Sequence, residues 1–157
     1  MAERDGIRIV ARNRKARHEY EVLEEIEAGL VLRGAEVKSL RDGRASFTDS
    51  FARVEGGEVW LHNLHISPYA HASVDAPDPV RRRKLLLNRR QIGRLTAQTR
   101  EAGLTLIPLD IHFRRGYAKV TLAVARGKKH RDKRDALKKK TMQREAERAI
   151  QDARRDR

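Results

Sequence analysis

Residues 107–124 read Ile-Pro-Leu-Asp-Ile-His-Phe-Arg-Arg-Gly-Tyr-Ala-Lys-Val-Thr-Leu-Ala-Val. Apolar side chains occupy alternate positions on both sides of Arg115-Gly116, first from Ile107 to Phe113 and then from Ala118 to Val124. Alternation at a period of two is typical of a half-buried β-strand, and a glycine readily takes the positive φ angle of a tight turn. The stretch therefore predicts a two-stranded antiparallel hairpin.

A second stretch shows the same pattern. Residues 50–54 and 59–66 carry alternating apolar side chains and flank Gly56-Gly57, and paired glycines are typical of the tight turns that join hairpin strands. We expect a hairpin here as well. Further extended segments are predicted at 18–23, at 30–32 after Gly29, and at 84–87.

One helix carries clear start and stop signals. Asn88 and Gln91 are three residues apart and can form a capping box, a stripe at helical spacing follows as far as Ala102, and Gly103 is placed to end the helix. A shorter helix is expected at 35–40.

These elements indicate a mainly β protein. About six strands, two or three helices and turn-rich connections favour a small antiparallel barrel, closed or nearly closed. An open sheet with one helix across it is the alternative. The stretch 67–83, which contains three prolines, is expected to be a surface loop that ends in the basic run Arg81 to Lys84.

The charge of the chain points to a polyanionic partner. Its 157 residues include 36 Lys+Arg and 22 Asp+Glu, a formal net charge of +14. Self-repulsion of this size is relieved when phosphates neutralise the cations, so nucleic acid is the first candidate and an anionic membrane surface the second. The charged N-terminus does not resemble a signal peptide, and no apolar run approaches the ~18 residues of a membrane span. We therefore expect a soluble, cytoplasmic protein. Because the basic C-terminal segment has few bulky apolar residues, we also expect no membrane partner.

The excess charge is concentrated at the C-terminus. Residues 126–157 hold 14 Lys+Arg and 6 Asp+Glu, net +8, and contain no Phe, Tyr or Trp. Such a segment cannot build a core and is expected to be disordered when free. Apolar or small residues at 142, 146, 149 and 153 share one helical face, so the tail is able to become helical against a surface. A solvated tail that only aids solubility is the alternative.

The sequence offers little reactive chemistry. Cysteine is absent, which excludes disulfides and thiolate chemistry. His62 and His65 are three residues apart in a predicted strand and would point to opposite faces, and no Gly-rich phosphate loop or nucleophile elbow occurs. The glutamates between Glu19 and Glu27 read as the solvent face of a strand. We expect no enzyme, metal, cofactor or small-molecule substrate; a metal-dependent ribonuclease remains the second hypothesis.

Candidate RNA-binding side chains come from separate parts of the body. Clustered arginines match phosphate oxygens in pairs, and His18 and Tyr20 offer stacking faces. Because only 4% of the residues are aromatic, recognition of folded RNA by shape is favoured over stacking of single-stranded bases. The cationic candidates are Arg14, Lys15, Arg17, Lys38, Arg41, Arg83 and Lys84.

A series of ordered motifs resembles one bacterial family. The motifs are residues 11–18 (ARNRKARH), 27–30 (EAGL), 34–41 (GAEVKSLR), 83–88 (RKLLLN), 103–108 (GLTLIP), Lys119-Val120 and 125–134 (ARGKKHRDKR). Together they are similar to the SsrA-binding protein (small protein B) family over residues 7–145. The resemblance implies an oligonucleotide-binding-fold barrel that binds the tRNA-like domain of transfer-messenger RNA and escorts it to stalled ribosomes, in the process called trans-translation.

The resemblance also implies a division of the chain. Residues 1–125 would form an RNA-binding barrel, and residues 126–157 a tail that enters the small-subunit decoding centre and the empty mRNA channel and becomes helical there, with a monomer bound to the RNA. A general ribosome-associated RNA-binding protein is the alternative.

Two positions depart from the family pattern. Arg131 stands where Tyr or His is frequent, so Arg131 or His130 would have to supply stacking there. Met142 stands where some relatives carry an aromatic residue.

Carried over by position, the family's RNA-binding residues correspond to Asn13, Tyr20, Glu27, Leu86 and Asn88. They complete the candidate RNA set formed by the cations and His18 above. The residues expected to contact the ribosome are Gly127, Lys128, Lys129, His130, Arg131, Asp132, Lys133, Arg134, Met142 and Ile150.

Overall fold

The computed structural model describes residues 6–68, 77–101, 103–128 and 130–155. The chain divides into two compact units, Met1–Gly127 and Lys128–Arg157. Among the described residues, the first unit contains all the strands and three helices, and the second contains one helix, α4 (His130–Arg155). Each unit is described by itself.

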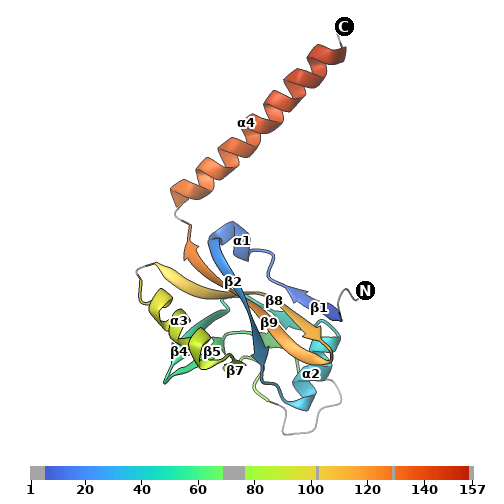
Figure 1. The fold of residues 1–157 in the computed structure, drawn as a ribbon. Coiled ribbons are helices and arrows are strands. Elements are labelled where there is room, and N and C mark those ends of the chain that lie inside the picture. Colours follow the sequence, from blue (N-terminus) through green and yellow to red (C-terminus); the bar gives the residue numbers. More distant parts are fainter. Residues whose placement is uncertain (1–5, 69–76, 102, 129, 156–157) are drawn as a thin grey trace. The chain divides into compact units, whose positions relative to one another are not determined.

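The first unit is built around a closed antiparallel barrel (Figure 1). Strand β8 pairs with both β4 and β9, so the order β8-β4-β5-β7-β2-β9 closes on itself. The predicted barrel of about six strands is confirmed, and the open sheet is not formed. Its strands are β2 (Tyr20–Leu30), β4 (Phe51–Glu55), β5 (Glu58–His62), β7 (Arg83–Leu86), β8 (Leu104–Arg114) and β9 (Tyr117–Gly127).

Three further strands lie outside this ring. Strand β1 (Ile7–Arg12) extends the sheet by pairing with β8 and was not predicted. Strands β3 (Ala45–Ser46) and β6 (His65–Ile66) form a separate two-stranded sheet. The single strand expected at 59–66 is divided into β5 and β6 because Asn63 takes a positive φ of 60°.

The predicted β8–β9 hairpin is confirmed, but a bulge alters which side chains share a face. Its turn residues Arg115 and Gly116 both have positive φ angles, 51° and 84°. The register shifts between Pro108 and Asp110. Ile111 therefore points into the main core, whereas Ile107 points to a second cluster on the other face. Proline favours such a shift because it lacks the N–H that a regular ladder requires.

The two apolar clusters stabilise opposite faces of the hairpin. The barrel interior holds fully buried side chains from every strand of the ring, among them Val59, Leu85 and Leu122. The outer cluster packs Ala16, Tyr20 and Phe51 over β8 and β9. Full burial of a large apolar side chain contributes roughly 1.5–3 kcal/mol, and Tyr20 and Phe51, which are partly buried, each contribute less than this. The outer cluster therefore fixes Tyr20 and Phe51 against a rigid sheet.

Strand β2 differs from the expectation of two extended segments. It runs unbroken over 11 residues, and it begins after the short helix α1 (Ala16–Glu19), so His18 is helical rather than extended. Val31 and Leu32 follow the strand instead of continuing it.

Both predicted helices are present. Helix α3 (Arg89–Thr99) has the expected capping box: the Asn88 side chain accepts a hydrogen bond from the Gln91 amide at 2.8 Å, and the Gln91 side chain accepts one from the Asn88 amide at 3.1 Å. The helix ends before Ala102, which lies outside the described residues. Helix α2 (Gly34–Arg41) buries Leu40 completely.

Helix α4 is exposed over most of its length. Residues 140–154 are exposed throughout, including Met142 and Ile150. A helix without tertiary packing depends on local hydrogen bonds and residue propensities, so disorder of the free tail stays a prediction. No helix among the described residues is long and apolar enough to cross a membrane.

Candidate RNA-binding surface

Most candidate RNA-binding residues of the barrel gather near the two ends of β2. Asn13, Lys15 and Tyr20 lie at the start of the strand, which we call the Tyr20 end. Glu27 and Leu86 lie toward its other end, the Glu27 end. A strand rises ~3.3 Å per residue, so Tyr20 and Glu27 are separated by about 23 Å along β2.

At the Glu27 end, one carboxylate oxygen accepts three hydrogen bonds. Glu27 Oε2 lies 3.0 Å from His112 Nε2, and it accepts from Arg114 Nε at 3.1 Å and Nη2 at 3.0 Å. Burial by itself raises the pKa of Glu27, but these donors outweigh it and hold the pKa below the ordinary 4.5. Glu27 is therefore a fixed, ionised acceptor at neutral pH.

His112 connects Glu27 to a second carboxylate. Its Nδ1 lies 2.7 Å from Asp110 Oδ1, which also accepts a hydrogen bond from Thr121 Oγ1 at 3.0 Å. The His112 side chain is only 5% exposed. Each ring nitrogen of His112 therefore lies within hydrogen-bond distance of a carboxylate oxygen. The sequence analysis missed this network, although its signal was available in the alternating polar residues at 110, 112 and 114.

The second oxygen of Glu27 remains available. None of the hydrogen bonds formed among the described residues uses Oε1, and the side chain is 35% exposed. The barrel thus presents one oriented acceptor to a donor group on a partner, such as a 2′-hydroxyl or the N–H groups of a base edge.

Leu86 lies on the strand that pairs with the end of β2, and Lys84 lies two residues before it on the same strand. Leu86 pairs with Gly29 of β2 and is 53% exposed. A Cβ added at Gly29 would lie 3.0 Å from the Leu86 Cβ, so the glycine makes room for that side chain. Lys84 is half-buried and forms an ion pair with Glu58 at 2.6 Å.

Asn88, also in the candidate set, uses its side-chain oxygen for the capping bond to the Gln91 amide. The side chain is nevertheless exposed.

The position of Arg83 contradicts the prediction made from the sequence. It was predicted to contact RNA, but its side chain is fully buried, with Nη2 at 2.7 Å from Glu36 Oε2. Its guanidinium also donates to the carbonyl oxygens of Leu64 and Pro79. The alternation of β7 turns Arg83 inward and Lys84 outward, so Arg83 stabilises the barrel and offers no surface to a partner.

The remaining cations of the set are exposed. Arg17 forms an ion pair with Glu25, and Arg41 places its guanidinium carbon 5.3 Å from the ring centre of Phe113. The other exposed members are Arg14, Lys15, His18 and Lys38.

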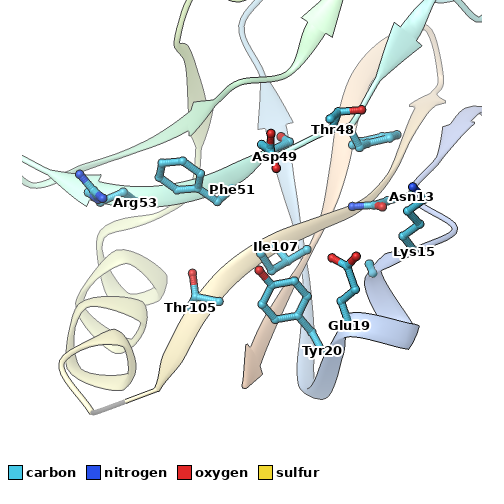
Figure 2. Close-up of a pocket in the computed structure, with 13 residues that line it drawn as sticks. Asn13, Lys15, Glu19, Tyr20, Thr48, Asp49, Phe51, Arg53, Thr105 and Ile107 are labelled. Atoms are coloured by element: carbon cyan, nitrogen blue, oxygen red, sulfur yellow. The ribbon is translucent and has the colours of Figure 1, made fainter. Parts of the chain in front are cut away.

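The Tyr20 end contains a pocket of about 560 Å³ (Figure 2). Asn13 is held beside it because its side-chain Nδ2 donates to the Pro108 carbonyl at 2.9 Å and its amide donates to the Leu109 carbonyl at 2.8 Å. Phe51 and Arg53 of β4 supply part of the opposite wall. The Phe51 and Arg53 contributions were not predicted, since the sequence gives no indication that β4 lies next to α1.

The predicted ribosome-contacting residues are only partly described. Gly127 is the last residue of β9 and pairs with Tyr20, and Lys128 follows it. Lys129 lies outside the described residues, as do the side chains of His130, Arg131, Asp132, Lys133 and Arg134. Met142 and Ile150 are 69% and 54% exposed. Among the residues that the structure describes, no group of three or more His, Asp or Glu side chains is placed to hold a metal ion.

Comparison with known proteins identifies the family. A model of the SmpB protein family matches residues 10–152. The chain belongs to the SmpB family. It is 54% identical over 145 residues to the SsrA-binding protein of Geobacillus thermodenitrificans, covering 92% of this chain and 94% of that protein. It is 55% identical over 150 residues to the SsrA-binding protein of Acidothermus cellulolyticus, covering 96% and 94%.

A solved structure supports the same assignment. It is described as "tmRNA-SmpB: a journey to the center of the bacterial ribosome", and the matching chain is 52% identical. The two chains superpose with a TM-score of 0.66 over 80% of this chain and 92% of the other. The resemblance found in the sequence motifs is therefore confirmed, and so is the oligonucleotide-binding type of barrel expected for an SmpB protein.

Proposed function

We propose that this chain is an RNA-binding adaptor that binds the tRNA-like domain of transfer-messenger RNA and delivers it to stalled ribosomes for trans-translation. The observation that carries the proposal is the match to SmpB over residues 10–152. Two further observations support it: relatives above 50% identity are SsrA-binding proteins, and a solved SmpB relative is described together with tmRNA and the ribosome.

In this proposal the barrel and the tail have separate tasks. The barrel binds folded RNA through the oriented Glu27 acceptor, the exposed Leu86 and the cations around them. The tail, with a net charge of +8 over residues 126–157, follows the phosphates of an empty mRNA channel and becomes helical there. Both tasks are binding, so the adaptor needs no catalytic group and no cofactor, and it works in the cytoplasm where ribosomes translate.

A reconstituted rescue reaction tests the proposal. Ribosomes stalled at the end of an mRNA without a stop codon are mixed with aminoacylated transfer-messenger RNA, with and without the purified full-length chain. We expect transfer of the nascent peptide to the charged RNA only when the chain is present. A control with a long mRNA downstream of the P site should show little transfer, because the channel is then occupied.

A general RNA-binding protein is the competing function, and the net charge of +14 favours it. Such a protein would bind many RNAs with similar affinity and a steep salt dependence, and it would not stimulate peptide transfer. RNA cleavage in the presence of Mg²⁺ would instead indicate a ribonuclease. Either result would contradict the adaptor.

A further inference from the structure

The pocket at the Tyr20 end combines groups that a nucleobase requires. Its walls come from α1, from β4 and the loop that precedes it, and from β8. Asp49, Phe51 and Arg53 form one side, and Lys15, Glu19 and Tyr20 the other (Figure 2). Its volume of about 560 Å³ falls in the range of about 300–1,000 Å³ that is usual for ligand sites.

Four charged side chains of this pocket, Lys15, Glu19, Asp49 and Arg53, are not used by the fold. Among the described residues, the side chains of Lys15, Glu19 and Asp49 form no hydrogen bond or ion pair, and Arg53 contacts only the Phe51 ring. Two cations and two carboxylates give the pocket no net charge. It is therefore poorly suited to a phosphate, and it suits a neutral ligand that carries both donors and acceptors.

The aromatic wall is preorganised. The Phe51 ring stacks on the His62 ring with a centroid distance of 5.1 Å and an interplanar angle of 12°. His62 is fixed in turn because its Nε2 lies 2.7 Å from Glu55 Oε1. Arg53 places its guanidinium carbon 5.3 Å from the Phe51 ring centre. A planar ring entering the pocket would meet apolar and aromatic side chains that are already in place, which reduces the entropic cost of binding.

The loop before β4 is also held in an unusual conformation. Asp49 has a positive φ of 59°, which is uncommon for a residue other than glycine. Its carbonyl accepts a hydrogen bond from Asn63 Nδ2 at 3.2 Å, and the adjacent Ser50 Oγ donates to the His62 carbonyl at 3.1 Å. Backbone strain of this kind is often kept where it positions a functional side chain; here it accompanies an unpaired carboxylate at the pocket wall.

We propose that this pocket receives a single unstacked nucleobase of a bound RNA. The base would lie against the apolar and aromatic wall, and the carboxylates of Glu19 and Asp49 would accept from its N–H groups. Guanine, adenine and cytosine carry an exocyclic amino group, whereas uracil does not; the pocket therefore favours the first three. The inference rests on the proposed RNA-binding function. Because the base is provided either by transfer-messenger RNA or by ribosomal RNA, the test separates these two sources.

The test uses the full chain with Asp49→Asn, which tolerates the left-handed backbone and removes only the carboxylate. Asp42→Asn, at an exposed carboxylate after α2, is the matched control. Binding to a tRNA-like-domain fragment and to small ribosomal subunits is measured separately. General attraction to phosphates predicts equal or tighter binding for both variants. We expect Asp49→Asn alone to weaken binding to one of the two RNAs about tenfold, and that RNA is the source of the base.

A second variant and a nucleotide probe complete the test. Phe51→Leu removes the aromatic face but keeps an apolar side chain, and thermal unfolding shows whether it stays folded. In NMR titrations of the wild-type chain, GMP should shift the signals of Tyr20 and Thr105 more than UMP does. Wild-type affinity of Asp49→Asn for both RNAs would overturn the pocket assignment. A wild-type chain that does not prefer the tRNA-like fragment over ordinary tRNA would instead overturn the proposed function.

Discussion

The barrel unit and the C-terminal helix are both basic, but they use their charges in different ways. In the barrel, some arginines form ion pairs that stabilise the fold: Arg83 is buried against Glu36, and Arg114 holds Glu27 in place. In α4, residues 140–154 are exposed. The barrel therefore presents a preformed surface to RNA, whereas the tail has to gain its stability from whatever it binds.

The largest expected effect comes from separating the two units. A chain that ends at Gly127 should keep its affinity for the tRNA-like domain within about twofold but lose peptide transfer completely in the rescue reaction. The cut belongs after Gly127 rather than at 125, the predicted boundary, because Arg126 and Gly127 still pair with β2. Equal loss of RNA binding and rescue, with an unchanged melting temperature, would contradict the division of tasks.

The next largest effect tests the arginine in the barrel core. Arg83→Met should lower the free energy of unfolding by about 3–5 kcal/mol, because it removes the fully buried partner of Glu36 and leaves the Leu64 and Pro79 carbonyls without their guanidinium donor. Denaturant unfolding measures the change. Lys84→Met is the matched control: its ion pair with Glu58 is half-exposed, so it should cost no more than about 1 kcal/mol. Similar losses in the two variants would show that Arg83 is not part of the core.

The same cluster predicts a pH dependence of barrel stability. Burial alone raises the pKa of Glu36, but hydrogen bonds from Arg81, from the Arg33 amide and from Arg83 outweigh it, so the pKa in the folded state lies below 4.5. The ionised group therefore stabilises the fold above pH 4.5, and this stability is lost as the pH falls through the lower, folded pKa. Unfolding measured from pH 6 to pH 3 should show the loss, and Glu36→Gln should flatten the curve. A wild-type curve that is flat over this range would contradict the assignment.

A smaller effect concerns RNA affinity at the Glu27 end. Glu27→Gln should weaken binding of the tRNA-like domain by roughly ten- to a hundredfold, since a hydrogen bond to a charged group contributes about 1.5–3 kcal/mol. The direction of the change in affinity is informative. Removing a negative charge from a basic surface would by itself tighten the binding of RNA. Glu21→Gln, at an exposed position of the same strand, is the control and should bind with at least wild-type affinity. Unchanged binding of Glu27→Gln would exclude a specific contact.

The smallest effect sharpens the description of the tail. Ala146→Gly together with Ala149→Gly should lower the helical circular dichroism of the full chain, because each glycine costs about 1 kcal/mol in an exposed helix. The melting temperature of the barrel should not change. A change in that temperature would show that α4 contributes to barrel stability.

The elements predicted from sequence are those with a strong local signal. The β8–β9 hairpin followed from its alternation and from Arg115-Gly116, and the start of α3 followed from the Asn88 capping box. Strand β1 was missed although Ile7, Ile9 and Ala11 stand at alternate positions; its pairing with β8, about 100 residues away in the chain, is a contact that no local pattern shows. The bulge at Pro108 was also missed, and it decides which face of β8 carries Ile107.

The prediction of the candidate site has the same limit: features that depend on distant parts of the chain were missed. Lys15, which was proposed from the clustered charge, and Leu86, which was carried over from the family resemblance, are both exposed, as a contact with RNA requires. Arg83 was assigned to the surface because a buried arginine depends on a distant partner, Glu36, which is 47 residues away in the chain. The pocket at the Tyr20 end likewise joins α1 to β4, a juxtaposition that no local pattern contains.

The central claim is that the barrel itself recognises the shape of one RNA. The most direct measurement is a competition titration of the chain ending at Gly127, at physiological salt, between the tRNA-like domain of transfer-messenger RNA and an ordinary tRNA. We predict a clear preference for the tRNA-like domain, which would leave the tail to the ribosome. Equal affinity for both RNAs would contradict the account, because the barrel would then contribute only general attraction to phosphates.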